Sequence, residues 1–192
     1  MRTRGFTLVE VLIASTIFIA ALAIVYGITA ESTDTARVGT NAGTLEGQAS
    51  RALNHIANEI VAAGVGTLEP PEPDGDSSLT FCKSNGADGA TILWGPRGSL
   101  GLRATAHGRE LVWVRDVDDP VQEVVLCGSV RPYAEGESPN GVDDNGNGLV
   151  DEEGLSFQLS GRTLTIRLTL ERKDRAVGLL TRTVSTSVTL RN

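Results

Sequence analysis

The feature that most constrains this chain is a continuous apolar run at residues 6–30, in which Glu10 is the only charged side chain. An α-helix rises about 1.5 Å per residue, so the 25 residues of this run reach roughly 37 Å. The hydrocarbon core of a bilayer is about 30 Å thick, and a helix of this length and composition can cross it. The run therefore predicts a membrane-spanning helix near the N-terminus.

Two arginines, Arg2 and Arg4, lie in the short leader that precedes the apolar run. A secretory signal peptide would instead carry a small-residue cleavage site after its apolar run. Basic residues beside a membrane helix stay on the cytoplasmic side, which predicts that the chain beyond Ala30 lies outside the cytoplasm.

Glu10 needs an explanation, because a carboxylate in a membrane helix costs about 2.5 kcal/mol or more at the bilayer centre and less near an interface. In one interpretation it is an interfacial acid near the lipid headgroups with no further role. In the other it pairs with a positive group of a neighbouring subunit once the helix leaves lipid for a protein bundle. The run itself offers it no opposite charge.

The sequence Gly5-Phe6-Thr7-Leu8-Val9-Glu10, followed by the long apolar run, resembles the class III signal of type IV pilins and type II secretion pseudopilins. The resemblance implies that a prepilin peptidase cuts between Gly5 and Phe6 and that the new N-terminal phenylalanine is methylated. It also implies that Glu10 neutralises the N-terminal amine of an adjacent subunit in a fibre.

The rest of the chain continues first as a helix and then as strands. A polar to amphipathic stretch predicts a second helical segment at residues 31–66, whose apolar side chains recur at the three- and four-residue steps of one helical face: Leu45, Ala49, Leu53, Ile56, Ile60 and Ala63. Glycines at every fourth position, Gly39, Gly43 and Gly47, each weaken a helix by about 1 kcal/mol relative to alanine, which predicts a loosened or bent middle.

Residues 67–192 form the predicted β-rich globular head. After a breaker-rich linker at 67–78, strand-like runs occur at 79–82, 90–94, 102–106, 110–117 and 121–130. Three antiparallel strands are predicted to close the chain, because Leu164, Ile166, Leu168 and Leu170 alternate with polar residues between two further strand-like runs. The predicted fold class is α+β, with a long N-terminal helix packed on an antiparallel sheet. The pilin resemblance implies the same architecture.

A second resemblance covers the helix and the C-terminal strands. Residues 51–60 followed by Ala63-Gly64, together with the closing threonine-rich strand that ends Leu190-Arg191-Asn192, are similar to the PilW- and GspJ-like minor pilins. The middle of the chain carries no motif of that group.

The acidic loop, residues 140–154, predicts a calcium site. Asp143, Asn145 and Asn147 alternate and Gly148 follows, as in the first half of the loop D-x-[DN]-x-[DN]-G, where a tight turn folds alternate oxygens around one hard cation. Position twelve, which holds a glutamate in a full EF-hand, is Gly154 here, so Asp151 and Glu152 or Glu153 are expected to close the shell, with the Leu149 carbonyl as the backbone ligand. The alternative is a solvated acidic turn.

Cys82 and Cys127 are the only cysteines, and both lie in strand-like runs of a region expected outside the cytoplasm, where disulfides persist. A Cys82–Cys127 disulfide is therefore expected, with two free thiols as the alternative.

The remaining composition argues against catalysis and nucleic-acid binding. The chain carries 17 basic and 24 acidic residues, for a formal charge of −7, and only two histidines. We therefore predict no catalytic residues.

The leading hypothesis is a minor pilin, PilW-like, that helps to start or cap a type IV pilus. The resemblance implies other minor pilins, a major pilin, a prepilin peptidase and an inner-membrane assembly platform as partners. It also implies a single pass through the bacterial inner membrane. The alternatives are a GspJ-like pseudopilin of a type II secretion system and a membrane-anchored, calcium-dependent adhesin that does not polymerise.

Overall fold

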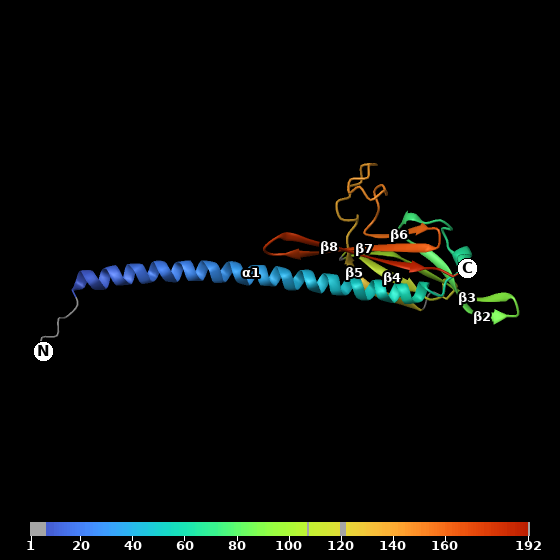
Figure 1. Cartoon of the computed structure of the whole chain (residues 1–192), viewed down its shortest axis with the longest axis horizontal. Coiled ribbons are helices and arrows are strands. Elements are labelled where there is room, and N and C mark those ends of the chain that lie inside the picture. Colours follow the sequence, from blue (N-terminus) through green and yellow to red (C-terminus); the bar gives the residue numbers. More distant parts are fainter. Residues whose placement is uncertain (1–6, 107, 120–121, 192) are drawn as a thin grey trace. The chain divides into compact units, whose positions relative to one another are not determined.

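The computed structural model describes residues 7–106, 108–119 and 122–191. Figure 1 shows one long helix followed by a β-sheet. The elements in chain order are α1 (Leu8–Ile60), the 3₁₀ turn η1 (Val65–Thr67), β1 (Asp74–Asp76), β2 (Leu79–Asp88), β3 (Thr91–Thr105), β4 (Gly108–Val114), β5 (Glu123–Val130), β6 (Leu155–Ser160), β7 (Thr163–Asp174) and β8 (Gly178–Thr189).

The chain divides into two compact units, Met1–Asn41 and Ala42–Asn192, and α1 begins in the first and ends in the second. We call the described parts the helical unit (residues 7–41) and the head unit (residues 42–191). Within the helical unit, every side chain from Thr7 to Arg37 is exposed. This exposed segment includes the one stretch of the described chain that is long and apolar enough to cross a membrane.

The expected loosening at the glycines does not occur, because α1 continues through Gly39, Gly43 and Gly47 as one α-helix. No side chain or neighbouring segment lies within 4 Å of a Cβ added at Gly39 or Gly43, so these two glycines serve no close packing in this chain. A cost of about 1 kcal/mol per glycine lowers the stability of a helix without breaking it when no proline is present.

The helix ends at Ile60 and not at residue 66 as expected. The chain leaves the helix because its backbone pairs with strands at this point. The backbone N–H of Ser84 donates to the Ala62 carbonyl (3.1 Å), and that of Arg191 donates to the Ala63 carbonyl (3.2 Å). Gly64 then lies so close to the Trp94 ring that a Cβ there would overlap it.

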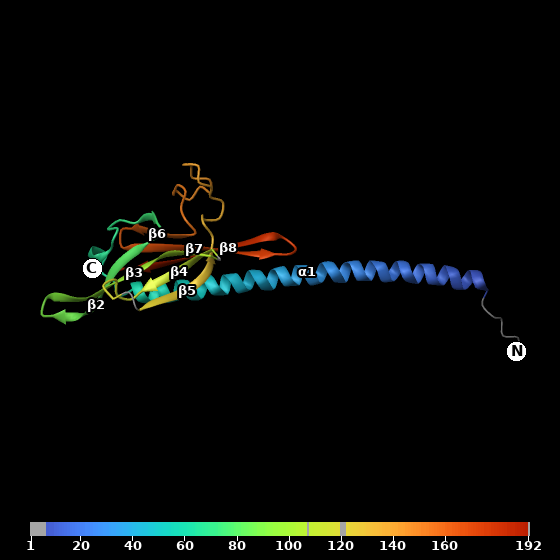
Figure 2. The same ribbon diagram turned by 180° about the vertical axis from the view of Figure 1, so that it is seen from behind.

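The core of the head unit lies between the last five turns of α1 and one face of the sheet (Figure 2). The predicted apolar face of the helix is confirmed, since its members Leu45, Ala49, Leu53, Ile56 and Ile60 are all buried, and Ala63 is buried as well. The sheet contributes alternate residues of its strands, as the two-residue period requires: Leu79, Phe81, Leu100, Leu111, Trp113, Leu155, Phe157, Leu164, Ile166, Leu168 and Leu170. His55 of α1 meets Trp113 of β4 edge-to-face, with ring centroids 5.1 Å apart.

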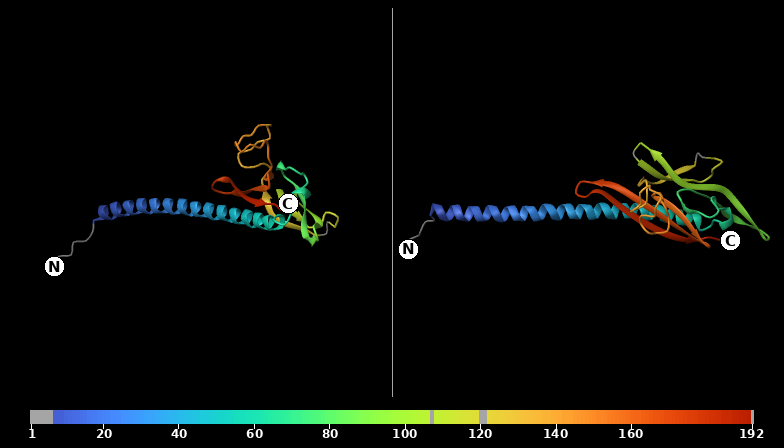
Figure 3. Two further views of the ribbon diagram at one scale, coloured as in Figure 1. Left: turned by 45° about the vertical axis from the view of Figure 1, so that its right-hand side comes forward. Right: turned by 90° about the horizontal axis from the view of Figure 1, so that it is seen from above.

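The sheet has the order β1-β6-β7-β5-β4-β3-β2, and β8 pairs with the other edge of β7 (Figure 3). The neighbouring strands named here pair antiparallel, and the predicted closing meander β6-β7-β8 is confirmed. β5 joins β7 at a single pair, Val130 with Leu170, beyond which the two strands separate. The α+β fold class is confirmed.

Two strand predictions are wrong in detail. The runs 90–94 and 102–106 belong to one strand, β3, which passes through Gly95-Pro96 because its register with β2 shifts between Cys82 and Ser84, and an irregularity of this kind tolerates proline. The expected linker contains the short strand β1, which pairs with β6. The run 121–130 begins outside the described residues and continues as β5.

Candidate functional site

Three features of the described chain bear on function: the start of α1, the acidic loop and a polar pocket beside β5.

α1 begins with a reciprocal cap between Thr7 and Glu10. The Glu10 backbone N–H donates to the Thr7 hydroxyl (3.3 Å), while one Glu10 carboxylate oxygen accepts from the Thr7 backbone N–H and from the Thr7 hydroxyl, both at 2.9 Å. This is the capping box, in which the residue before the helix and the third helical residue satisfy each other's free donors. Glu10 therefore has a local hydrogen-bond partner, although the apolar run offers it no opposite charge. Gly5 and Phe6, the predicted processing site, lie outside the described residues.

Hydroxyl groups within the apolar segment are satisfied by the helix itself. Ser15 donates to the Leu12 carbonyl (2.9 Å), Thr16 to the Ile13 carbonyl (2.8 Å) and Thr29 to the Val25 carbonyl (2.8 Å). Such back-bonding removes the need for an external hydrogen-bond partner, so these residues are compatible with a lipid environment.

The acidic loop stands on the face of the sheet opposite α1 in the head unit (Figure 1). Its first turn is organised by Asp143, whose carboxylate accepts from the backbone N–H groups of Gly146 (2.6 Å), Asn147 (3.2 Å) and Gly148 (2.8 Å). These bonds, that from Gly148 foremost, lower the pKa of the Asp143 carboxyl. Asn145 and Asn147 accept in turn from the N–H groups two residues further on.

Asp151 organises a separate turn. Its two carboxylate oxygens accept from the backbone N–H groups of Asn140 (3.0 Å) and Gly141 (2.8 Å), and its own φ is +52°. The carboxylates of Asp143 and Asp151 are therefore both engaged by backbone donors of different turns. The side chain of Leu149, the predicted backbone ligand, is buried, and a Cβ added at Gly75 of β1 would lie 3.5 Å from one of its methyl groups.

Two glutamates beside these turns are buried, Glu137 with 4% and Glu152 with 3% of its surface exposed. One oxygen of Glu137 accepts from the Asn145 backbone N–H (3.0 Å). One oxygen of Glu152 accepts from the side-chain amides of Asn145 (3.1 Å) and Asn147. The second oxygen of each carboxylate is buried and has no hydrogen-bond partner.

Glu152 was an expected ligand, whereas Glu137 was not anticipated. Glu137 precedes Asp143 by six residues and falls outside the alternating pattern, so spacing alone gave no signal for it. The chain brings it back because the segments on either side of the loop run together: Ala134 N–H donates to the Glu152 carbonyl (3.0 Å), and Arg109 pairs with Glu153 (2.7 Å). Glu153, the other expected candidate, is thereby committed to an ion pair.

The absence of a glutamate at position twelve has a structural cause. Gly154 is buried where the chain crosses Arg131, and a Cβ at residue 154 would overlap the Arg131 carbonyl. Its carbonyl accepts from the Thr169 N–H of β7 (2.6 Å). Among the described residues no three aspartate, glutamate, histidine or cysteine side chains are gathered as a metal-binding group.

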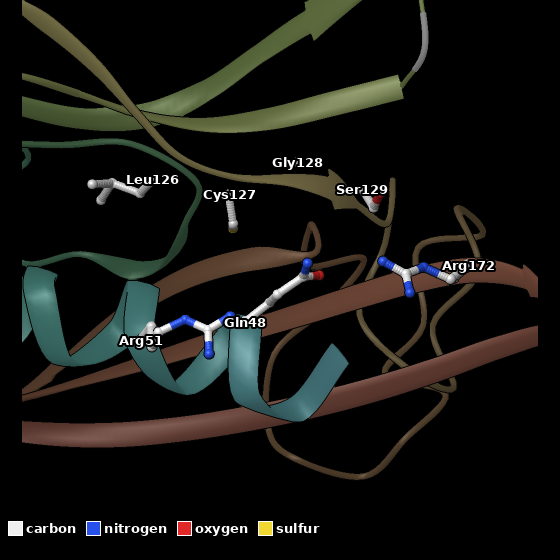
Figure 4. Close-up of a pocket in the computed structure, with 7 residues that line it drawn as sticks. All are labelled: Gln48, Arg51, Leu126, Cys127, Gly128, Ser129 and Arg172. Carbon is white, nitrogen blue, oxygen red and sulfur yellow. The ribbon is translucent and has the colours of Figure 1, made fainter. Parts of the chain in front are cut away.

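The pocket beside β5 has a volume of about 300 Å³ and lies where β5 separates from β7. Gln48 and Arg51 of α1, residues 126–129 of β5 and Arg172 of β7 line it, and Figure 4 shows the Gln48 and Arg172 side chains pointing toward one another. Neither arginine forms an ion pair with another described residue. The lining offers hydrogen-bond donors without a carboxylate, a set that suits an anionic group.

The expected Cys82–Cys127 disulfide is wrong for this structure, in which both cysteines are free thiols. Cys82 lies on β2 and Cys127 on β5, and β3 and β4 lie between these strands. Neighbouring strands are about 4.8 Å apart, so two intervening strands hold the Cα atoms well beyond the roughly 7 Å limit of a disulfide. Burial raises the pKa of the Cys127 thiol to about 11.

Comparison with known proteins bears on the N-terminus. Residues 1–26 match the prokaryotic N-terminal methylation motif, which confirms the expected class III signal. No curated protein and no solved structure matches the chain. The motif and the apolar start of α1 together support a subunit of the type IV pilin or pseudopilin type.

Proposed function

We propose that this chain, which carries the prokaryotic N-terminal methylation motif at residues 1–26, is a PilW-like minor pilin that helps to start or cap a type IV pilus. The motif is the observation that carries the proposal. The exposed apolar segment of α1 supports it, because a surface of this kind requires lipid or other apolar helices around it. The chain acts in this proposal as a structural subunit and not as an enzyme.

The proposed mechanism begins in the bacterial inner membrane, where the apolar part of α1 spans the bilayer once and the head unit lies outside the cytoplasm. A prepilin peptidase removes the leader at Gly5, and an assembly platform moves the subunit into a fibre of other minor pilins and the major pilin. The apolar helices then form the bundle at the centre of the fibre.

The hydrogen bonds from Thr7 reduce the cost of placing the Glu10 carboxylate in the membrane before assembly. Two donors from Thr7 hold one Glu10 oxygen, which offsets part of the cost of a carboxylate in lipid, about 2.5 kcal/mol or more at the bilayer centre. Thr7 supplies these hydrogen bonds but no positive charge. The N-terminal amine of a neighbouring subunit would supply that charge, so assembly is favoured by a charge pair made in a low dielectric medium.

A pair of substitutions separates the cap from the charge. Glu10→Gln keeps an oxygen that can accept from Thr7 but removes the negative charge, whereas Thr7→Val removes the hydroxyl and keeps the charge. We expect both variants to insert in the membrane. The Glu10→Gln variant should fail to co-purify with fibre subunits, and Thr7→Val should co-purify at close to the wild-type level. Equal recovery of Glu10→Gln and wild-type protein in fibres would exclude the assembly role of the charge.

N-terminal analysis of protein from its native membrane tests the processing step. The proposal requires Phe6, methylated, as the first residue. Retention of Met1 in fibres would contradict it, and a protein that is uncleaved throughout the membrane would favour the non-polymerising anchor. Deletion of the gene separates the remaining alternatives, because loss of surface fibres identifies a pilus subunit, while loss of protein export with fibres intact identifies a GspJ-like pseudopilin.

A further inference from the structure

The buried carboxylates of Glu137 and Glu152 are the least satisfied charged groups of the acidic loop region. One oxygen of Glu137 accepts from the Asn145 backbone N–H (3.0 Å), and one oxygen of Glu152 accepts from the Asn145 side-chain amide (3.1 Å). The second oxygen of each carboxylate is buried and has no hydrogen-bond partner. Both side chains are more than nine-tenths buried. A carboxylate in this position loses its hydration without full replacement, which destabilises the folded chain unless a cation compensates.

No cationic side chain compensates them among the described residues. Two arginines that contact the segments flanking the loop have other partners: Arg109 pairs with Glu153, and Arg131 donates to the Ala134 carbonyl and pairs with Glu171. The ion pairs of the described chain do not include Glu137 or Glu152. Two buried acids face one turn with no positive charge from the protein.

We propose that Glu137 and Glu152 bind one divalent cation, calcium, beside the turn formed by Asn145 and Asn147. The unpartnered oxygens of the two glutamates supply the charge. The two asparagine side chains position Glu152, because their amide N–H groups donate to one of its oxygens while their own oxygens accept backbone N–H groups. Asp143 and Asp151 hold the backbone turns that position these ligands, because their carboxylates accept backbone N–H groups.

The donor set favours calcium over other common cations. All proposed ligands are oxygens, which suits a hard cation and gives no preference for zinc or copper. The loop contains three glycines with positive φ, Gly141, Gly146 and Gly148, whose tight turns resemble the glycine-containing turn of known calcium loops. Magnesium requires near-octahedral geometry and retains several waters, which a site formed from two buried side chains accommodates poorly.

This assignment revises the ligand set that the sequence pattern predicts. The pattern places the charged ligands at Asp143, Asp151 and Glu152 or Glu153. In the structure Asp143 and Asp151 cap turns, and the proposed charge comes from Glu137, which precedes the acidic loop, and from Glu152 near its end. Glu137 thereby supplies a carboxylate that residue 154 cannot supply, because a side chain there would overlap the Arg131 carbonyl.

Calorimetric titration of calcium into the full chain, purified in detergent and treated with a chelator, tests the proposal. The wild-type protein should bind one calcium ion. The double variant Glu137→Gln/Glu152→Gln should lose this binding, and Glu152→Gln alone should weaken it by at least roughly the 10–100-fold that changes beyond the ligand shell produce. Asp144→Asn is the matched control, because it removes an exposed carboxylate from the same loop and should bind as the wild type does.

Thermal unfolding gives a readout that separates a metal site from two structural side chains. In chelator the double glutamine variant should unfold at or above the wild-type temperature, because it no longer buries unpaired charge. Calcium should raise the wild-type temperature, as expected for a ligand of the folded state, and should leave the double variant unchanged. Millimolar magnesium should raise the wild-type temperature less.

The proposal is overturned if the wild-type chain gives no calcium heat at millimolar calcium, or if the double variant binds calcium as the wild type does. It is also overturned if the double variant unfolds well below the wild type in chelator, since that result assigns the glutamates a structural role without a cation. These readouts do not depend on fibre formation, so the calcium site and the pilin function can fail independently.

Discussion

Replacement of Gly154 by alanine would test the close backbone crossing between Gly154 and Arg131. This crossing explains why residue 154 is a glycine, where an EF-hand loop has a glutamate. The added Cβ would overlap the Arg131 carbonyl, and neither backbone segment can move freely. Arg131 N–H donates to the Thr169 carbonyl (3.0 Å), while Thr169 N–H donates to the Gly154 carbonyl (2.6 Å). The three segments are therefore linked, and relief of the overlap must stretch or break one of these bonds.

The expected destabilisation follows from these contacts. Insertion of a methyl group into a packed site costs about 1–3 kcal/mol, and loss of one buried backbone hydrogen bond adds about 1 kcal/mol. The free energy of unfolding should thus fall by about 2–4 kcal/mol. With a denaturant dependence of about 2 kcal/mol per molar urea, the midpoint should move down by about 1–2 M.

Gly128→Ala is the matched control. Gly128 lies in β5, its φ is not positive, and the nearest atom to an added Cβ is Glu110 Cγ at 4.0 Å. An alanine there is unstrained and should leave stability unchanged or raise it by about 0.4–1 kcal/mol. Urea unfolding of the full chain in detergent, followed by the fluorescence of the buried Trp113, measures both variants. A midpoint for Gly154→Ala equal to that of Gly128→Ala would refute the crossing as described.

Three further predictions follow from the core, the thiols and the loop. Ile56→Ala should lower the free energy of unfolding by about 2–5 kcal/mol, because Ile56 is fully buried between α1 and the sheet, whereas Val61→Ala, at a site 46% exposed, should cost much less in the same urea assay. Mass spectrometry after alkylation without reductant should find both thiols free, and an intrachain bridge would contradict the strand order. Alkylation of Cys127 should be slow at pH 8, because its pKa of about 11 leaves little thiolate. Because the pKa of Asp143 is lowered in the folded chain, its carboxylate stabilises the fold at pH values above the ordinary aspartate pKa of about 3.9. This stabilisation should be lost as the pH falls through the lowered folded pKa. Asp143→Asn should therefore show a shallower loss of thermal stability between about pH 5 and pH 2.

Local periodicity was sufficient to predict much of the fold. The buried face of α1 and the meander β6-β7-β8 were predictable because a helix face and a strand face each follow a fixed step along the sequence. The end of α1 was not predictable in this way. It is set by backbone pairing of Ala62 and Ala63 with strands that occur much later in the chain.

The separation of the two cysteines and the buried glutamates of the loop could not be predicted from the sequence, for a related reason. Location outside the cytoplasm favours a disulfide, but only the order of β2, β3, β4 and β5 shows that Cys82 and Cys127 are too far apart. The spacing of Asp143, Asn145 and Asn147 correctly marked a tight turn, whereas the choice between side chains that cap a turn and side chains with a free buried oxygen depends on tertiary contacts. Glu137 could be found only once the two flanks of the loop were seen to run together.

The pairing of the C-terminal residues with the end of α1 has a consequence for the order of folding. The Val65 N–H donates to the Arg191 carbonyl (3.0 Å), a contact between residues 126 positions apart, while α1 is held by bonds between residues four positions apart. Contacts of such long range form slowly, and helices form within about a microsecond. During synthesis α1 can therefore be complete while the strands it will cover are still unpaired, and the interval before Arg191 emerges is when their exposed edges are most open to aggregation.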